Sequence, residues 1–349
     1  MDDKATESQK AKSKTRETGA VTMATIGKLA GVSQVTVSRA LSHPEKVSPA
    51  TLQRIQDAIR MTGFVPNALA GALASKKSCL ITALVPSITN VVYSSLLHGF
   101  SDILRAEGYQ MMVSETGFEP ETEEALIFTH LSRRPDGILL TGIHHSATAR
   151  KMLLGADIPV VEVWDMTESP IDCCVGFSHA ETGRRAAEFA YEAGCRQAAT
   201  VTAGDERAMR RRDAFRARFS ELTGSQQQIG VDSQPGPASL AGGRAALRLL
   251  IERDGFRNGV VFCSSDQYAH GILVEAQAQG LRIPEDLAVI GFGDQDFAAH
   301  TSPALTTIRV DRDRLGRAAA NALLSRFKGA ADPEPVTDIG FEILRRASA

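Results

Sequence analysis

The chain has 349 residues, of which 43% are hydrophobic and 23% are charged, and its net charge is −2. This length exceeds one ordinary hydrophobic core and predicts two or three domains. The composition is typical of a globular protein, and the longest apolar stretches are short enough to be buried strands. Residues 1–20 are polar and of mixed charge, so we expect no secretory signal, no membrane association and a cytoplasmic location.

The five cysteines are scattered, odd in number and without a CxxC pair. They therefore predict neither a disulfide framework nor a zinc site. The adjacent His144 and His145 lack a Cys, Asp or Glu at a metal-binding spacing. We accordingly expect no metal and no cofactor.

Charge is distributed unevenly along the chain. Residues 1–78 carry 12 Lys and Arg against 6 Asp and Glu, a net charge of +6. Residues 79–349 carry 27 against 35, a net charge of −8. A basic N-terminal region indicates a polyanionic partner such as nucleic acid. Chance clustering of charged residues could give the same imbalance, so sequence motifs are needed to distinguish it from a nucleic-acid-binding region.

The N-terminal region predicts short helices. Residues 1–20 lack hydrophobic periodicity and are expected to be disordered. Ser33 can cap one helix, and Ser48 followed by Pro49 is typical of the start of another, which Gly63 ends. A weak helix, interrupted by a glycine, follows these. The expected helices are 24–30, 34–41, 48–62 and 67–75.

From Cys79 onward, apolar strands alternate with amphipathic helices, and the pattern restarts after Asp172. This alternation predicts two doubly wound lobes, each with a parallel sheet. The expected strands are 80–85, 110–114, 137–141, 160–163, 197–202, 259–263 and 287–291. The expected helices are 94–107, 121–132, 147–154, 180–193, 207–222, 243–253 and 268–279.

The strongest motif is residues 21–41, where two short helices join through Gly31. This arrangement predicts a helix-turn-helix whose second helix enters the major groove of DNA. Gln34 and Val35 then face base edges, and Arg39, one turn later, can donate two hydrogen bonds to guanine. An ordinary three-helix domain with an exposed polar face is the alternative. The hydroxyls that can bind phosphates belong to Ser33, Thr36 and Ser38.

These residues resemble the DNA-binding head of the lactose-repressor family of transcriptional regulators. The resemblance continues through Ala70-x-x-Leu73, which is similar to that family's hinge helix, and into the C-terminal part of the chain. The matching motifs are Thr22, Ala30-Gly31-Val32-Ser33, Thr36-Val37-Ser38-Arg39, Val47-Ser48, Phe64-Val65-Pro66-Asn67, Ile290-Gly291-Phe292-Gly293-Asp294 and Pro303-Ala304-Leu305-Thr306-Thr307-Ile308.

The resemblance implies an all-α helix-turn-helix DNA-binding head joined to an α/β periplasmic-binding-protein-like body. The implied parts are a head at 21–66, a hinge helix or linker at 67–78, and an effector-binding and dimerisation body at 79–349. The first lobe of that body is expected at about 79–175 plus 309–329, and the second at about 176–308 plus 330–349.

The same resemblance implies a sequence-specific repressor that binds a pseudo-palindromic double-stranded DNA operator as a homodimer. Thr22 and Asn67 belong to its expected DNA-contacting residues. Leu73 is expected to act as a wedge between base pairs in the minor groove. Release and strengthening of DNA binding by an effector both occur in that family.

The resemblance further implies an effector between the lobes, where the carboxyl ends of parallel strands face the cleft. Arginine can clamp a carboxylate or phosphate there, and serine and aspartate can bind hydroxyls. The residues at the family's positions are Tyr93, Arg211, Ser265 and Asp294.

Departures from the family pattern leave alternatives open. Ala214 stands where the family usually has glycine, so Arg210 or Arg212 could be the ligand instead of Arg211. Asp294 is preceded by a glycine in place of the usual aspartate, so it is either a ligand or a turn residue. The neighbour of Ser265 is an aspartate at position 266, which we interpret as a helix cap.

Three segments resemble the gluconate-operon repressor subgroup: Leu140–His145, Val160–Trp164 and Gly291–Asp294. They suggest a small sugar-acid effector, such as gluconate or a phosphorylated relative, whose carboxylate opposes Arg211. An anion near Glu162 is unfavourable unless that carboxylate binds hydroxyls at the far end of the ligand. The further residues expected to line the pocket are Thr141, His145, Glu162 and Trp164.

Two other functional classes fit the sequence less well. A periplasmic sugar-binding protein would share the two lobes, but it should carry a signal peptide and lack the helix-turn-helix. An enzyme is not expected, because the sequence contains no P-loop, no GxSxG elbow, no HExxH and no Rossmann glycine fingerprint.

Overall fold

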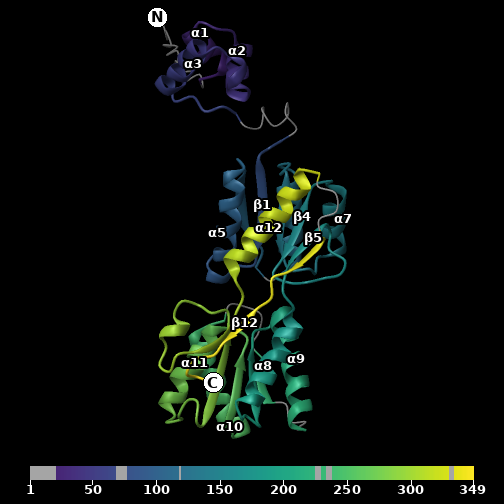
Figure 1. Cartoon of the computed structure of the whole chain (residues 1–349), viewed down its shortest axis with the longest axis vertical. Coiled ribbons are helices and arrows are strands. Elements are labelled where there is room, and N and C mark those ends of the chain that lie inside the picture. Colours follow the sequence, from purple (N-terminus) through teal and green to yellow (C-terminus); the bar gives the residue numbers. More distant parts are fainter. Residues whose placement is uncertain (1–20, 68–76, 118, 225–228, 233–237, 330–333) are drawn as a thin grey trace, which may run out of the picture. The chain divides into compact units, whose positions relative to one another are not determined.

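The computed structural model describes residues 21–67, 77–117, 119–224, 229–232, 238–329 and 334–349. The chain divides into two compact units, Met1–Ser75 and Lys76–Ala349, which we call the head and the body (Figure 1). The predicted disordered tail, most of the predicted hinge helix and Leu73 lie outside the described residues.

The head contains the three helices expected for a helix-turn-helix domain. Gly31 ends the first of them in the left-handed region, with φ of 67°, which a residue with a Cβ adopts only with strain. A Cβ at Gly27 would lie 2.8 Å from Val32 O, so a glycine is needed for this tight turn. The helices are α1 (Met23–Ala30), α2 (Gln34–Ser42) and α3 (Pro49–Thr62), with a short 3-10 turn, η1 (Pro44–Lys46), before α3.

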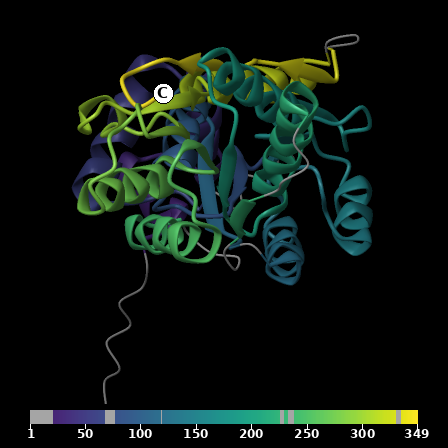
Figure 2. The same ribbon diagram turned by 90° about the horizontal axis from the view of Figure 1, so that it is seen from below.

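The first lobe of the body is a six-stranded parallel sheet with helices on both faces (Figures 1 and 2). Its strands, in spatial order, are β11 (Val336–Asp338), β5 (Cys173–Gly176), β4 (Val160–Val163), β3 (Gly137–Thr141), β1 (Leu80–Val85) and β2 (Gln110–Glu115). Its helices are α5 (Val91–Ala106), α6 (Pro120–Leu131), α7 (Ala147–Gly155) and α12 (Arg312–Phe327).

Alternation of side chains along the strands produces the two packed faces of this sheet. Ile81 and Leu139 belong to one hydrophobic cluster with Phe100 of α5, whereas Leu84 and Leu140 belong to another on the opposite face. Because successive side chains of a strand point to opposite faces, both faces of a central strand must be apolar. The buried strands predicted from the sequence have this pattern.

The second lobe repeats the architecture with one antiparallel edge. Its strands, in spatial order, are β12 (Glu342–Leu344), β10 (Thr306–Arg309), β9 (Leu287–Phe292), β8 (Gly259–Cys263), β6 (Ala198–Thr202) and β7 (Ile229–Asp232), and β12 runs antiparallel to β10. Its helices are α8 (His179–Glu192), α9 (Glu206–Thr223), α10 (Leu240–Asp254) and α11 (Asp266–Ala278), with a 3-10 turn, η2 (Ala298–His300). The predicted fold class is therefore confirmed.

The chain passes between the lobes three times: after β5, after β10, and between β11 and β12. The third passage corrects the predicted lobe boundaries. Residues 330–349 were assigned wholly to the second lobe, but β11 pairs with β5 of the first sheet, and only β12 joins the second. The sequence also missed β5, β7, β10, β11, β12 and α12, and each of these strands has only three or four residues. Within the described ranges, no helix is long and apolar enough to cross a lipid bilayer.

Candidate functional site

Helix α2 of the head has one exposed face that carries the residues predicted to read DNA bases. Gln34, Val35 and Arg39 are exposed, and the side chain of Val35 is 67% accessible although it is apolar. The opposite face, with Val37 and Ala40, is buried in the core of the head. Arg39 forms no ion pair with any described residue, so its guanidinium is available to an external acceptor such as a base edge.

The hydroxyls predicted to bind phosphates also begin the helices. Ser33 Oγ accepts a hydrogen bond from the N–H of Thr36 at 3.2 Å, and Thr22 Oγ1 accepts one from the N–H of Thr25 at 3.3 Å. Helix N-termini attract anions, so these positions suit a DNA backbone. Ser38 is exposed on α2, and Asn67 is exposed at the end of the described head.

Two adjoining cavities lie between the lobes, at the carboxyl ends of the strands. The smaller, of about 90 Å³, is lined by Tyr93, Trp164, Arg211 and Ser265, which come from different elements. The larger, of about 400 Å³, is lined by Thr141 together with many charged residues. The cavities share two lining residues, Asp205 and Arg207. Five of the eight predicted effector-site residues thus line one cavity or the other.

A third cavity, of about 890 Å³, lies at the other end of the first sheet. Lys77, Asp136 and Pro159, which precede strands β1, β3 and β4, line it with mostly apolar neighbours. It is larger than the other two, but ligands of open α/β sheets bind at the carboxyl ends of the strands. We therefore place the candidate site in the cleft.

Arg211 is the most constrained residue of the smaller cavity. It is only 4% exposed, and its guanidinium lies 3.8 Å from the centroid of the Phe292 ring. Its Nη2 donates to Ser264 O at 3.2 Å, whereas its Nε has no hydrogen-bond partner. Burial lowers the pKa of Arg211 to about 10, so the group stays charged at neutral pH.

Close packing of two helices fixes the position of Arg211. A Cβ at Gly183 of α8 would lie 2.1 Å from Arg211 O, so only glycine allows α8 to cross α9 this tightly. The same crossing brings His179 to the guanidinium, at 2.9 Å between His179 Nδ1 and Arg211 Nη1. Burial, and next the charge of Arg211, lower the pKa of His179 well below its usual range, so the imidazole is neutral.

His179 ties the two lobes together at the cavity. Its Nε2 donates to Trp164 O at 2.9 Å while its Nδ1 accepts from Arg211, and one neutral tautomer satisfies both bonds. Trp164 has a positive φ of 71°, and its ring meets the edge of Tyr93 at 6.0 Å. The rings of Tyr93 and Trp164, from the first lobe, are thereby held close to Arg211 of the second.

The arginines of α9, among which the sequence left alternatives open, have different partners. Arg210 pairs with Asp165 across the cleft and lines the larger cavity, and Arg212 pairs with acidic residues of its own lobe and lines neither. Arg207, which the sequence did not single out, lies where the cavities meet. Its Nη2 is 3.4 Å from Tyr93 Oη, and its buried Nη1 has no hydrogen-bond partner.

His145 and Glu162 correct the predicted pocket lining. Their side chains are 1% and 0% exposed, and neither lines a cavity between the lobes. His145 Nδ1 lies 2.5 Å from Glu123 Oε1, and His145 Nε2 lies 3.3 Å from Glu162 Oε1. Burial alone would lower the pKa of His145, but the two carboxylates outweigh it and raise this pKa to about 9. The imidazolium and its carboxylates therefore form a buried ion cluster inside the first lobe.

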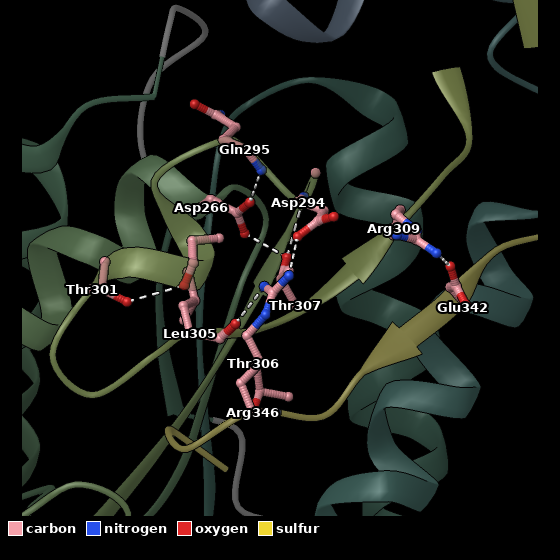
Figure 3. Close-up of polar contacts among 12 residues, drawn as sticks. Asp266, Asp294, Gln295, Thr301, Leu305, Thr306, Thr307, Arg309, Glu342 and Arg346 are labelled. Carbon is pink, nitrogen blue, oxygen red and sulfur yellow. Dashed lines mark hydrogen bonds and ion pairs between the residues drawn. The ribbon is translucent and has the colours of Figure 1, made fainter. Parts of the chain in front are cut away.

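Asp294 and Asp266 have structural partners (Figure 3). Asp294, at a φ of 45°, accepts a hydrogen bond from Arg346 at 2.7 Å and does not line the smaller cavity, so the turn-residue interpretation fits its position. Ser265, not Asp266, is the N-cap of α11, which corrects the expected cap. Asp266 is buried and accepts from Thr307 Oγ1 at 2.5 Å and from the N–H of Gln295 at 2.7 Å.

Asp266 thereby holds the loop that brings Gln295 to the cavity, a lining residue that the sequence did not indicate. Burial raises the pKa of Asp266 to about 6. No group of three or more His, Cys, Asp or Glu among the described residues could hold a metal ion.

Comparisons with known proteins cover both units. Residues 22–67 match the model for bacterial regulatory proteins of the lacI family, and residues 187–349 match that for a periplasmic binding protein-like domain. The HTH-type transcriptional regulator GntR of Pseudomonas aeruginosa is 35% identical, with 96% of this chain and 97% of that protein aligned. GntR of Escherichia coli K12 is 32% identical, over 90% of this chain and 94% of that protein. A crystal structure of a LacI family transcriptional regulator from Silicibacter pomeroyi superimposes with a TM-score of 0.87 at 32% identity, covering 94% of this chain and 98% of that one.

Proposed function

Because the chain belongs to the lacI family of bacterial regulatory proteins and is a DNA-binding transcriptional regulator, we propose that it is a repressor controlled by a sugar acid. The proposed effector is gluconate or a phosphorylated relative, and it changes the affinity for a pseudo-palindromic operator. The relatives named above are transcriptional regulators and not enzymes, and this chain is a regulator as they are.

The proposed DNA contacts follow the exposed face of α2. In a homodimer, two copies of α2 enter successive major grooves, with Gln34, Val35 and Arg39 at the base edges. The hydroxyls of Ser33 and Thr36 lie beside them at the start of α2, where they suit phosphates. The remaining proposed contacts are Thr22, Ser38, Asn67 and Leu73.

The charge of the smaller cavity is the observation that carries the effector assignment. Arg207 and Arg211 both line it, and each has a buried N–H group without a hydrogen-bond partner. Unlike Arg210 and Arg212, neither forms an ion pair with a carboxylate of the described residues. A buried charge without a partner is costly, and a ligand carboxylate removes that cost by accepting from both guanidiniums.

The rest of the lining suits a polyhydroxylated chain. Tyr93 and Trp164 offer apolar ring surface to the C–H groups of a sugar, and Ser265 and Gln295 offer hydrogen bonds to its hydroxyls. Thr141 lies in the adjoining larger cavity, where its hydroxyl donates to Leu84 O at 3.0 Å and can still accept a bond.

Control of DNA binding follows from the position of the cavity between the lobes. A ligand that bridges Trp164 of the first lobe and Arg211 of the second favours one relative placement of the lobes. If the DNA-binding dimer favours a different placement, effector and operator weaken each other by about 1–3 kcal/mol. If both favour the same placement, the effector is a corepressor.

The test begins with an operator selected by the purified chain from a pool of random palindromic DNA. Fluorescence anisotropy then measures operator affinity without ligand, with gluconate, and with 6-phosphogluconate. We expect at least one sugar acid to shift the binding curve for wild type but not for Arg211→Met. Arg212→Met, on the same helix but away from both cavities, should respond like wild type. Tight operator binding that no sugar acid shifts would refute the effector assignment.

A further inference from the structure

The two cavities of the cleft differ in charge. The larger is lined by five carboxylates and two guanidiniums, those of Arg207 and Arg210. The smaller is lined by two guanidiniums, those of Arg207 and Arg211, and by the single carboxylate of Asp205. Since the cavities adjoin at Asp205 and Arg207, a ligand whose carboxylate lies between the arginines extends its other end into the acidic cavity. The five carboxylates of that cavity are Glu119, Glu123, Asp165, Asp205 and Glu206.

Two cationic or basic groups of the acidic cavity contact carboxylates of the chain: Arg210 pairs with Asp165, and His144 Nε2 lies 3.0 Å from Glu206 Oε1. Arg207, which lines both cavities, forms no ion pair with a described residue, and the proposed function assigns it, with Arg211, to the carboxylate of the ligand. Glu119 forms no ion pair with a described residue. Once that carboxylate is bound, no described arginine of the larger cavity is left without an anionic partner to receive a second negative charge of a ligand.

Two helices begin at this cavity, and helix N-termini ordinarily favour anions. Their own acidic residues already occupy those positions. The first turn of α6 carries Glu121 and Glu123, and α9 is capped by Asp205, which accepts from the N–H of Ala208 at 2.9 Å, with Glu206 next in the chain. The helix dipoles therefore do not offset the acidic lining.

Building on the proposed function, we propose that the cleft selects a sugar acid with one negative charge and rejects one with a second anionic group at its far end. Hydroxyls at the far end donate hydrogen bonds to the carboxylates of the larger cavity, whereas a phosphate or a second carboxylate is repelled. Glu119 from the first lobe and Glu206 from the second, which both line that cavity, are the specificity residues. Of the two effectors proposed above, gluconate and its phosphorylated relative, this selectivity leaves gluconate.

Isothermal titration calorimetry of the full-length chain tests the proposal with three ligands of matched carbon skeleton: gluconate, glucarate and 6-phosphogluconate. We expect gluconate to bind at least about tenfold more tightly than glucarate or 6-phosphogluconate, which corresponds to about 1.4 kcal/mol. The preference should shrink at high salt, because Glu119 and Glu206 are exposed enough to be screened.

A double variant, Glu119→Gln with Glu206→Gln, removes two negative charges from the cavity and should reduce the preference to about threefold or less. The matched control, Glu121→Gln with Glu221→Gln, removes one charge from each of the same helices outside the cavity. It should keep the preference of wild type. Circular dichroism checks that both variants are folded.

A ligand of opposite charge tests the proposal without any variant. In 6-amino-6-deoxygluconate an ammonium replaces the far hydroxyl, and wild type should bind it at least as tightly as gluconate. If glucarate or 6-phosphogluconate binds as tightly as gluconate, the proposed selectivity is wrong, whereas the sugar-acid assignment stands. If no sugar acid binds at all, both proposals are wrong.

Discussion

The body contains two buried groups of charged residues near the cleft, and they differ in charge balance. In the first lobe, the imidazolium of His145 lies between the carboxylates of Glu123 and Glu162. In the second, Arg207 and Arg211 line a cavity without a carboxylate ion partner among the described residues. A buried cation that pairs with carboxylates of its own lobe has its counterions within the fold, whereas buried cations without such a partner need an external anion. The comparison distinguishes residues that stabilise the lobe from residues proposed to bind the ligand.

The largest effect expected from this comparison is on the stability that the His145 cluster contributes to the first lobe. Glu162→Gln leaves the charge of His145 with one carboxylate and should lower the free energy of unfolding by about 3 kcal/mol, because a broken buried ion pair costs about that much. Urea unfolding followed by circular dichroism measures the loss. The affinity of the folded variant for gluconate should stay within about twofold of wild type. A variant of unchanged stability that no longer binds would place Glu162 in the ligand site after all.

The reverse result is expected for the two arginines of the second lobe. Arg211→Met removes charge-assisted hydrogen bonds to the ligand, which are worth about 1.5–3 kcal/mol, so calorimetry should show at least about tenfold weaker binding of gluconate. The free energy of unfolding should change by less than about 1 kcal/mol, because the loss of the hydrogen bonds to His179 and Ser264 is offset by removal of a buried charge that has no anionic partner. Severe destabilisation would show instead that Arg211 acts mainly as a structural residue.

The pH dependence of stability distinguishes the two clusters again. The folded-state pKa of His145, about 9, lies above the unfolded value of 6.5. Its contribution to stability is therefore fully present below about pH 6.5 and is lost as the pH rises through about 9. Urea midpoints measured from pH 6 to pH 9.5 should fall by an amount equivalent to about 3 kcal/mol. Glu162→Gln should flatten this decline, and an equally steep decline in that variant would contradict the assignment.

The smallest effect concerns Arg207, which is less enclosed than Arg211. Arg207→Gln keeps a donor beside Tyr93 but removes the charge, and it should weaken gluconate binding by about fivefold to tenfold. Its matched control is Arg212→Gln, which lies on the same helix and lines neither cavity. Equal effects of the two substitutions would indicate a general loss of positive charge rather than a contact at the cavity.

Regular patterns made much of the fold predictable. The helix-turn-helix follows from hydrophobic spacing, from caps such as Ser33, and from Gly31 at a turn that needs a left-handed residue. The alternation of strands and helices predicted both lobes. The strands that the sequence did not predict, such as β5 and β11, are too short to show an alternating hydrophobic pattern. Their place in the sheet depends on partner strands that are distant in the sequence.

The site was less predictable, because burial and pairing are tertiary properties. The sequence of α9 holds several arginines, and only the tight crossing at Gly183 determines that Arg211 is buried beside the cleft. Glu162 was expected to line the pocket because its segment resembles the gluconate-operon repressor subgroup, but it pairs with His145 inside the lobe. Arg207 and Gln295 belong to no recognisable sequence motif, and their positions at the cavity follow from how the two lobes pack together.

The central claim is that the anion site of the body controls the DNA affinity of the head. The most direct test measures the affinity for gluconate twice, once with the free protein and once with the protein saturated by its selected operator. Linkage requires the two affinities to differ by the same factor by which gluconate changes operator affinity, about fivefold or more. Equal affinities in the two states would contradict the account, even if gluconate and operator each bind well.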